Sequence, residues 1–140
     1  MGVSCHIRPA TKDDLVAIAK IQEASPQASH WDPGEYLAYD CVVAEVADKV
    51  CGFLVSRETA PGEREILNLA VEPSSRRKGI ARALLEHQFR SYQGDWYLEV
   101  RESNAEATKL YENLHFKRVA VRKGYYDTPP ESAIVMRFFS

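Results

Sequence analysis

Residues 65–89 read EILNLAVEPSSRRKGIARALLEHQF, and the fold depends on this stretch. The apolar run at 65–71 is typical of a buried strand, which Pro73 ends. From about Arg77 to Tyr92 apolar residues recur every three or four positions, which predicts a helix. A strand that leads through a short basic turn into a helix is part of a strand–helix–strand crossover. We therefore expect a chain that mixes helices with a sheet.

The remaining elements follow outward from this stretch by periodicity and turn chemistry. Strands are expected at 6–8, 41–46, 50–55, 96–101, 119–121 and 133–139, and helices at about 11–25, 32–40 and 104–114. Antiparallel strands followed by a crossover predict an α+β fold, with a mixed, mostly antiparallel sheet of about seven strands and helices on both faces. The length of 140 residues, without repeats or linkers, predicts a single domain over residues 1–140.

The composition excludes several classes of protein. Lys plus Arg number 18 against 20 Asp plus Glu, a net charge of −2, which argues against direct nucleic-acid binding. There is neither an apolar run of about 18 residues nor the apolar segment of a secretory signal, so no membrane association is expected. Three cysteines without ligand spacing and scattered histidines predict no metal site and a reducing, cytoplasmic location. Cys41 and Cys51 lie in apolar runs and are expected to be structural.

The basic turn at residues 76–82 carries the strongest chemical signal. Its seven positions hold four cations and no acid: Arg76, Arg77, Lys78 and Arg82. Free N–H groups and the helix dipole at this place favour a bound anion, and Gly79 lets the backbone approach a pyrophosphate closely. A solvated run of charge is the alternative. The turn has neither the glycine spacing of a dinucleotide-binding fold nor the GKS or GKT ending of a P-loop.

Residues 76–81 match the (Arg/Gln)-x-x-Gly-x-(Gly/Ala) signature of the GNAT acetyltransferases, and the chain resembles that family along essentially its whole length. Residues 98–116, LEVRESNAEATKLYENLHF, resemble its RimI type, the ribosomal-protein-alanine N-acetyltransferases, as do residues 66–73 and the pair Tyr125-Tyr126. The resemblance implies the GNAT fold, with acetyl-CoA as cosubstrate. It implies cofactor contacts from these residues: Leu69, Ala70, Val71, Arg76, Arg77, Lys78, Gly79, Ile80, Ala81, Asn104 and Tyr111.

Acetyl transfer to an amine requires a base for the amine and an acid for the departing thiolate. Strand alternation places Glu99 opposite the apolar residues of its strand, and a carboxylate on a covered strand is suited to accept a proton. The resemblance assigns Glu99 the role of base, whereas an ion pair with Arg101 or another cation is the alternative. It makes Tyr111 the acid, for which core packing is the alternative. Asn104 is suited to cap its helix and, by resemblance, binds the pantetheine arm.

The acceptor is indicated by the charge distribution and by the resemblance. Residues 11–48 contain eight acids and two bases, whereas residues 73–90 contain five bases and one acid. A cationic protein N-terminus or basic peptide would be attracted to the first segment; a solvated acidic face is the alternative. In RimI-like proteins the acceptor groove lies between the first helices and the late hairpin. This makes candidate acceptor contacts of Trp31, Tyr36, Tyr125, Tyr126 and Asp127.

The predicted function is transfer of the acetyl group of acetyl-CoA to the N-terminal α-amine of a protein, such as a ribosomal protein beginning with Ala, by direct attack in a ternary complex. The alternatives are acetylation of a small amine or a protein lysine, and a non-catalytic acyl-CoA-binding module. A monomer or weak dimer is expected. We expect Asn68 to be an edge or turn-facing polar residue. His115 stands where the family has glycine and is expected in the left-handed conformation.

Overall fold

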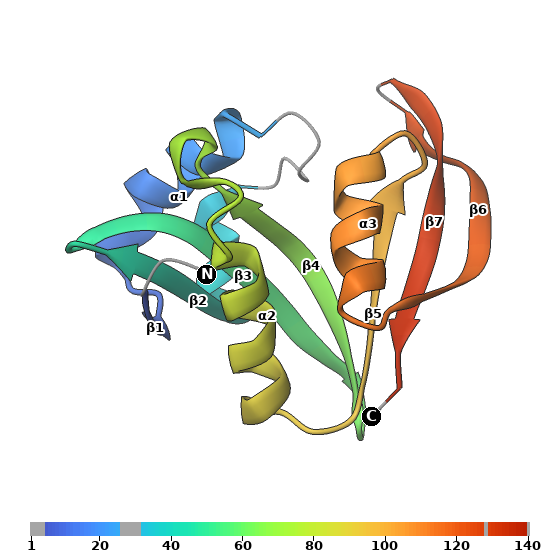
Figure 1. The fold of residues 1–140 in the computed structure, drawn as a ribbon, viewed down its shortest axis with the longest axis horizontal. Helices are drawn as coiled ribbons and strands as arrows, with labels where there is room; N and C mark the ends of the chain where they lie inside the picture. The colour runs from blue at the N-terminus through green and yellow to red at the C-terminus, as the bar shows by residue number, and fades with distance from the viewer. Residues whose placement is uncertain (1–4, 26–31, 128, 140) are drawn as a thin grey trace. The chain divides into compact units, whose positions relative to one another are not determined.

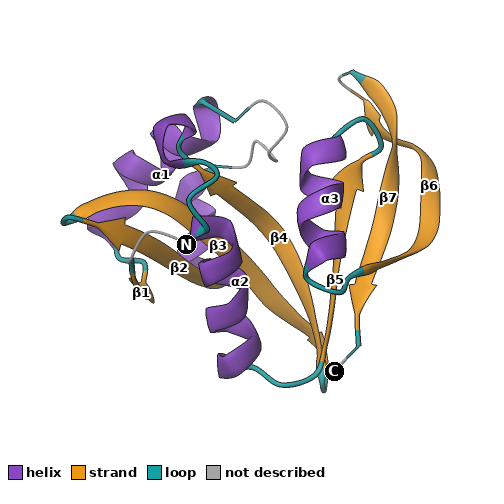
Figure 2. Cartoon of the chain, in the orientation of Figure 1, coloured by secondary structure: helices purple, strands orange, loops and turns teal. Residues whose placement is uncertain are grey.

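The computed structural model describes residues 5–25, 32–127 and 129–139. Within these residues the strands form a seven-stranded sheet in the order β1-β2-β3-β4-β5-β7-β6 (Figure 1). The strands are β1 (His6–Pro9), β2 (Asp40–Val46), β3 (Lys49–Ala60), β4 (Glu63–Val71), β5 (Asp95–Arg101), β6 (Lys117–Asp127) and β7 (Pro130–Phe138). The α-helices are α1 (Leu15–Glu23), α2 (Ile80–Ser91) and α3 (Ala105–Asn113), and the 3-10 helices are η1 (Lys12–Asp14), η2 (Pro33–Ala38) and η3 (Pro73–Ser75) (Figure 2). The expected α+β class, with a mixed and mostly antiparallel sheet, is confirmed.

The chain divides into two compact units. Unit 1 comprises Met1–Arg57 and Leu67–Tyr92, and unit 2 comprises Glu58–Ile66 and Gln93–Ser140. Unit 1 therefore contains β1, β2, α1 and α2, whereas unit 2 contains β5, β6, β7 and α3. The long strands β3 and β4 contribute residues to both units.

Helices cover both faces of the sheet in unit 1. On one face, α1 and η2 share an apolar core with the strands, formed by Ile18, Ile21, Tyr36, Cys41, Val43, Phe53, Val55 and Ala70. Gly52 precedes Phe53 and so faces the other side of β3. A Cβ atom on Gly52 would lie 3.2 Å from Cγ2 of Ile80, the first residue of α2. Helix α2 thus packs closely on the second face, as the sequence predicts.

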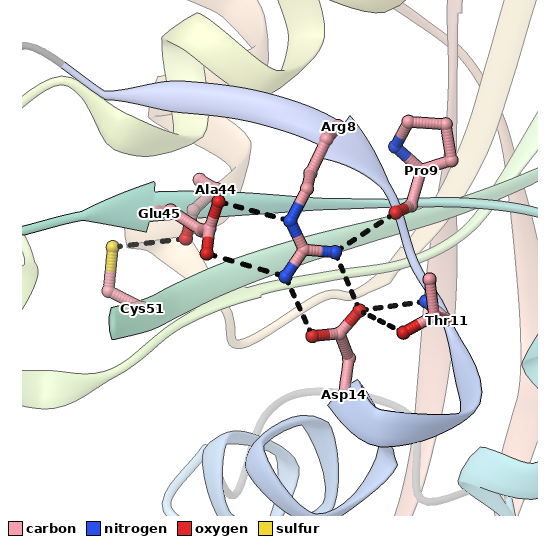
Figure 3. Close-up of polar contacts among 7 residues, drawn as sticks. All are labelled: Arg8, Pro9, Thr11, Asp14, Ala44, Glu45 and Cys51. Carbon is pink, nitrogen blue, oxygen red and sulfur yellow. Dashed lines mark hydrogen bonds and ion pairs between the residues drawn. The ribbon is translucent and has the colours of Figure 1, made fainter. Parts of the chain in front are cut away.

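Arg8 joins three elements of unit 1 (Figure 3). Its guanidinium donates to both carboxylate oxygens of Asp14 at 2.8 Å and to Glu45 Oε1 at 3.0 Å. Asp14 also accepts the backbone N–H of Thr11 at 2.7 Å. The hydrogen bonds from Arg8, more than that from Thr11, lower the pKa of the Asp14 carboxyl to about 2, although burial opposes this. The network ties β1, η1 and β2 to one another.

In unit 2, β5 runs parallel to the start of β4 and antiparallel to β7. The chain enters β5 through Gly94, which has a φ of +128° and whose Cβ position lies 2.5 Å from the Gly62 carbonyl oxygen. Any side chain at residue 94 would therefore collide with the neighbouring turn. Along β5, the residues of one face are buried: Trp96, Leu98 and Val100. Glu99 lies on the opposite face, as strand alternation predicts.

Element boundaries differ from the sequence prediction at two places that matter for the site. The helix expected from about Arg77 begins at Ile80, because Gly79 adopts a left-handed conformation with a φ of 81°. The strand expected at 119–121 is part of the longer β6, Lys117–Asp127. Most side chains of β6 are exposed and many are charged, so side-chain propensity does not reveal it; pairing with β7 maintains it. Residues 122–127, which the sequence prediction placed between the last two strands, therefore belong to β6.

Two further findings concern membranes and metals. Among the helices of the described residues, none is long and apolar enough to cross a membrane. Within the same part of the chain, no three side chains of His, Cys, Asp or Glu gather in a way that could hold a metal ion.

Candidate active site

The basic turn in unit 1 ends as an open helix N-terminus. Gly79 is the N-cap of α2, and the first intrahelical hydrogen bond joins the Ala83 N–H to the Gly79 carbonyl at 3.0 Å. The N–H groups of residues 80–82 precede that bond, so they have no partner within the helix. Arg77 and Lys78 are exposed beside them. These groups form a positive site suited to the pyrophosphate of a nucleotide cofactor.

Arg76 has a different position from the other cations of the turn. Its Nε donates to the Val71 carbonyl at 3.1 Å, and its Nη2 donates to Ser25 Oγ at 3.1 Å. The guanidinium thus fastens the turn to the end of β4 and to the residues that follow α1. The signature motif predicted a cofactor contact for Arg76 but gave no sign of this anchoring role.

A buried polar network lies beside Leu69, Ala70 and Val71, the strand residues that are expected to contact the cofactor. The Tyr36 hydroxyl donates to Gln22 Oε1, and Asn68 Nδ2 donates to the Tyr36 hydroxyl at 3.0 Å and to Gln22 Oε1 at 3.2 Å. Asn68 Oδ1 accepts the Leu69 N–H at 3.0 Å. The expectation that Asn68 is an edge or turn-facing residue is therefore wrong, since it is 5% exposed. Its amide fixes the backbone at the start of the strand Leu69-Ala70-Val71.

The prediction of Tyr36 as an acceptor contact is also wrong. Its side chain is fully buried, and its ring stacks on Phe53 with centroids 5.8 Å apart. The ring lies in the core because η2 places Tyr36 against the apolar residues Ile18 and Ile21 of α1. Trp31, another predicted acceptor contact, lies outside the described residues.

Glu99 in unit 2 has two unequal carboxylate oxygens. Oε1 accepts a hydrogen bond from Arg122 Nη1 at 2.8 Å, whereas Oε2 is buried and has no hydrogen-bond partner among the described residues. The side chain of Glu99 is 13% exposed. The ion pair that the sequence left open as an alternative is therefore present, but with Arg122. Arg101 pairs with Glu131 at 3.3 Å instead.

Tyr125 and Tyr126, the aromatic pair of β6, each stack on one of the two arginines. The Arg122 Cζ lies 4.3 Å from the ring centre of Tyr125, and the Arg101 Cζ lies 4.3 Å from that of Tyr126. The two tyrosine rings meet edge to face at 5.0 Å. Burial, followed by the charge of Glu99, raises the pKa of Tyr126 to about 12. Burial, the charge of Glu99 and a hydrogen bond to the Glu99 side chain raise the pKa of Tyr125. Both hydroxyls stay protonated at neutral pH and can donate hydrogen bonds to an acceptor.

Unit 2 therefore brings three of the residues predicted from the sequence, Glu99, Tyr125 and Tyr126, into one cluster. Asp127, also predicted, is exposed at the end of β6 opposite Pro130 in the strand register. Sequence reasoning missed Arg122. Its approach to Glu99 depends on the irregular pairing of β6 with β7 between Arg122 and Tyr126, which no local pattern indicates.

Helix α3 carries the remaining predicted site residues of unit 2. Asn104 caps the helix, since its Oδ1 accepts the Ala107 N–H at 3.1 Å. The cap uses the amide oxygen of Asn104 and does not use the amide nitrogen Nδ2. Tyr111 is 6% exposed and packs edge to face against Phe116 at 5.4 Å. Burial raises the pKa of Tyr111, so its hydroxyl keeps its proton at neutral pH. The expected left-handed conformation of His115 is confirmed, with a φ of 72°.

The buried cysteines are poorly suited to nucleophilic chemistry. Burial raises the pKa of the Cys41 thiol to about 12 and also raises that of Cys51. The thiolate is the nucleophilic form, so burial disfavours nucleophilic chemistry at both residues. This agrees with the structural role expected from their apolar surroundings.

This chain is similar to several known acetyltransferases. A profile described as acetyltransferase (GNAT) domain matches residues 38–118. An N-alpha-acetyltransferase of Saccharolobus solfataricus is 44% identical over 97% of this chain and 94% of its own length. The ribosomal protein bS18-alanine N-acetyltransferase of Escherichia coli K12 is 38% identical over 94 residues, and this match spans 63% of each protein. A crystal structure of the ribosomal-protein-S18-alanine N-acetyltransferase from Escherichia coli has a TM-score of 0.84 and 29% identity, covering 97% of this chain and 94% of that one.

Proposed function

The chain belongs to the GNAT family of acetyltransferases, and we propose that it transfers the acetyl group of acetyl-CoA to the N-terminal α-amine of a protein. Membership of the family confirms the resemblance that the sequence indicates. The observation that carries the proposed chemistry is the Glu99 carboxylate, with one oxygen held by Arg122 and the other buried without a partner in the described residues. Such an oxygen is suited to accept a proton from an amine.

Unit 1 supplies the groups that would hold the cofactor. The free N–H groups at the start of α2, with Arg77 and Lys78, would bind the pyrophosphate, and Ile80 and Ala81 would present their backbone to it. Backbone groups of the strand Leu69-Ala70-Val71 would bind the pantetheine arm. Family membership assigns a further contact with that arm to Asn104, which belongs to unit 2. Each of these contacts is a proposal that follows from family membership.

Unit 2 supplies the groups that would move protons. Acetyl-CoA provides the acetyl group as a thioester, whose carbonyl carbon is attacked by the acceptor amine in a ternary complex. As the N–C bond forms, Glu99 Oε2 accepts the proton that the nitrogen loses, directly or through a water molecule. As the C–S bond breaks, the Tyr111 hydroxyl donates its proton to the departing sulfur. The products are an N-acetylated acceptor and the free thiol, and no residue of the chain is itself acetylated.

The choice of acceptor rests on the relatives and on the aromatic pair. The relatives described above are named as an N-alpha-acetyltransferase and as an alanine N-acetyltransferase of a ribosomal protein, which favours an α-amine over a lysine or a small amine. The protonated hydroxyls of Tyr125 and Tyr126 can donate to the carbonyl groups of an N-terminal peptide, and exposed Asp127 can attract its charge. An alanine at the first position, as in a ribosomal protein, is the specific acceptor that we propose, and the cytoplasm is where such an acceptor is made.

The test is a panel of acceptors incubated with acetyl-CoA and analysed by mass spectrometry. The panel contains peptides beginning with Ala, Ser, Met and Gly, the same peptides with a blocked N-terminus and a free lysine, and polyamines. We expect acetylation of the α-amine, fastest for Ala, and its loss in Glu99→Gln. Acetylation confined to lysine or polyamines would replace the proposed acceptor with one of the alternatives. Cofactor binding without transfer to any amine would support a non-catalytic acyl-CoA-binding module.

A further inference from the structure

Arg122 makes a contact with Glu99 that differs from the other ion pair described for β6, that of Arg118 with Glu112. Its side chain is 54% exposed, yet its guanidinium reaches a carboxylate that is 13% exposed. The contact is short, at 2.8 Å, and involves Oε1. The buried Oε2 has no hydrogen-bond partner among the described residues. The ion pair thus leaves the two oxygens of Glu99 in different states.

The guanidinium of Arg122 is itself held in place. It stacks on the ring of Tyr125 at 4.3 Å, and the backbone of Gly124 between them has a φ of 64°. The irregular register between Arg122 and Tyr126 brings the cation and the ring together on one strand. A planar guanidinium can stack on a ring and donate a directed hydrogen bond at the same time, which an ammonium group cannot do equally well.

We infer that Arg122 is a positioning residue for the proposed base: it holds Glu99 by Oε1 and thereby reserves Oε2 for the proton of the acceptor amine. This inference rests on the proposed function and adds to it a residue that no part of the family signature requires. A carboxylate held at one oxygen cannot rotate about its terminal bond without breaking a charged hydrogen bond. Loss of Arg122 frees that rotation, so the reacting oxygen spends less time in the productive orientation.

The chain offers a matched control on the same strand. Arg118 is 55% exposed and pairs with Glu112 at 3.7 Å, and Glu112 is 49% exposed. Arg118→Gln therefore removes the same charge from the same strand at nearly the same exposure. The difference between the two variants isolates the contact with Glu99 from any general effect of lowering the charge of β6.

The experiment compares Arg122→Ala, Arg122→Lys and Arg118→Gln with the wild type, using the amine that the wild type acetylates fastest. We expect Arg122→Ala to lower kcat by about 10- to 100-fold, the scale of a misplaced catalytic group, with KM for acetyl-CoA unchanged within a factor of about two. Arg122→Lys should recover part of the loss, and Arg118→Gln should match the wild type. Adding guanidinium ion, well below the concentrations that unfold proteins, should raise kcat of Arg122→Ala but not that of Glu99→Gln.

Two results would overturn the inference. One is a kcat for Arg122→Ala equal to that of the wild type. The other is a loss that neither guanidinium ion nor the lysine variant reverses, which would show that Arg122 supports the fold of the hairpin. If the wild type acetylates no amine at all, the proposed function fails, and the positioning role fails with it. An active wild type with an unaffected Arg122→Ala contradicts the positioning role alone.

Discussion

The two units of the chain contribute different kinds of chemistry. In unit 1, the groups suited to the cofactor are backbone N–H groups at the start of α2 and cations that carry a fixed charge. In unit 2, the groups suited to the reaction are side chains that gain or lose protons, Glu99 and Tyr111. A change to the cofactor groups of unit 1 should therefore alter binding of acetyl-CoA and appear in KM, whereas a change to Glu99 or Tyr111 should appear in kcat.

The largest effect is expected for Glu99→Gln in unit 2. This variant keeps the shape of the side chain but cannot accept the proton of the amine. We expect kcat to fall by about 10²- to 10⁴-fold, with KM for acetyl-CoA little changed. Steady-state kinetics over a range of pH measure both constants. Unchanged turnover at all pH values would remove Glu99 from the mechanism.

A second variant tests whether the ionic network of unit 1 serves stability alone. Asp14 has a pKa of about 2, below its ordinary value of 3.8, so its charged form stabilises the fold. This contribution, about 2 kcal/mol, is complete above about pH 4 and is lost as the pH falls toward about 2. Asp14→Asn should therefore lower the free energy of unfolding at pH 7 by about that amount and flatten its decline in acid.

Denaturant titration at several pH values measures this loss. Asp13→Asn is the matched control, since Asp13 is exposed in the same turn. Turnover per folded molecule should stay at the wild-type level in both variants. A selective loss of kcat in Asp14→Asn would mean that the division of roles between the two units is incorrect.

A third variant addresses the basic turn. Gly79 has a φ of 81°, and a side chain in the left-handed region costs about 1–2 kcal/mol. Gly79→Ala should distort the N–H groups at the start of α2 and raise KM for acetyl-CoA by about 10-fold, which corresponds to about 1.4 kcal/mol, with kcat at saturation nearly unchanged. Gly62→Ala is the control, because Gly62 has a φ of +75° and open space around its Cβ position. An equal rise of KM in both variants would contradict a specific role for the turn.

The smallest effect is expected at the end of α3. His115 has a φ of 72°, a conformation that glycine adopts without strain. His115→Gly should raise Tm by a few degrees, through about 1 kcal/mol of relieved strain, and leave turnover nearly unchanged. Calorimetry and steady-state kinetics test the two halves of this prediction. A large loss of activity would give His115 a role in the site.

The same difference between the units explains what could be predicted from the sequence. The basic turn depends on a local order of strand, turn and helix, so its position was predictable from residues 65–89, although the helix begins at Ile80 and not at about Arg77. Strand alternation likewise placed Glu99 on the correct face of β5. The fold class and the family were predictable because their motifs are contiguous in the chain.

What could not be predicted depends on contacts between distant segments. The anchoring of Arg76 on Ser25 and the network of Tyr36 with Asn68 join residues far apart in the sequence. Burial of Tyr36 follows from the packing of η2 under α1, which a lone tyrosine in a short segment does not reveal. The Glu99–Arg122 pair depends on the register of β6 and β7, and a shift of one residue would turn the guanidinium to the other face.

The central claim, that this chain acetylates an N-terminal α-amine through Glu99, is tested most directly with one peptide that begins with Ala and contains an internal lysine. The peptide is incubated with acetyl-CoA and either the wild type or Glu99→Gln, and fragment-ion mass spectrometry locates the acetyl group. The predicted result is acetyl on the α-amine with the wild type, and slower by at least about 100-fold with the variant. Acetyl on the lysine, or equal rates for the two proteins, would contradict the claim.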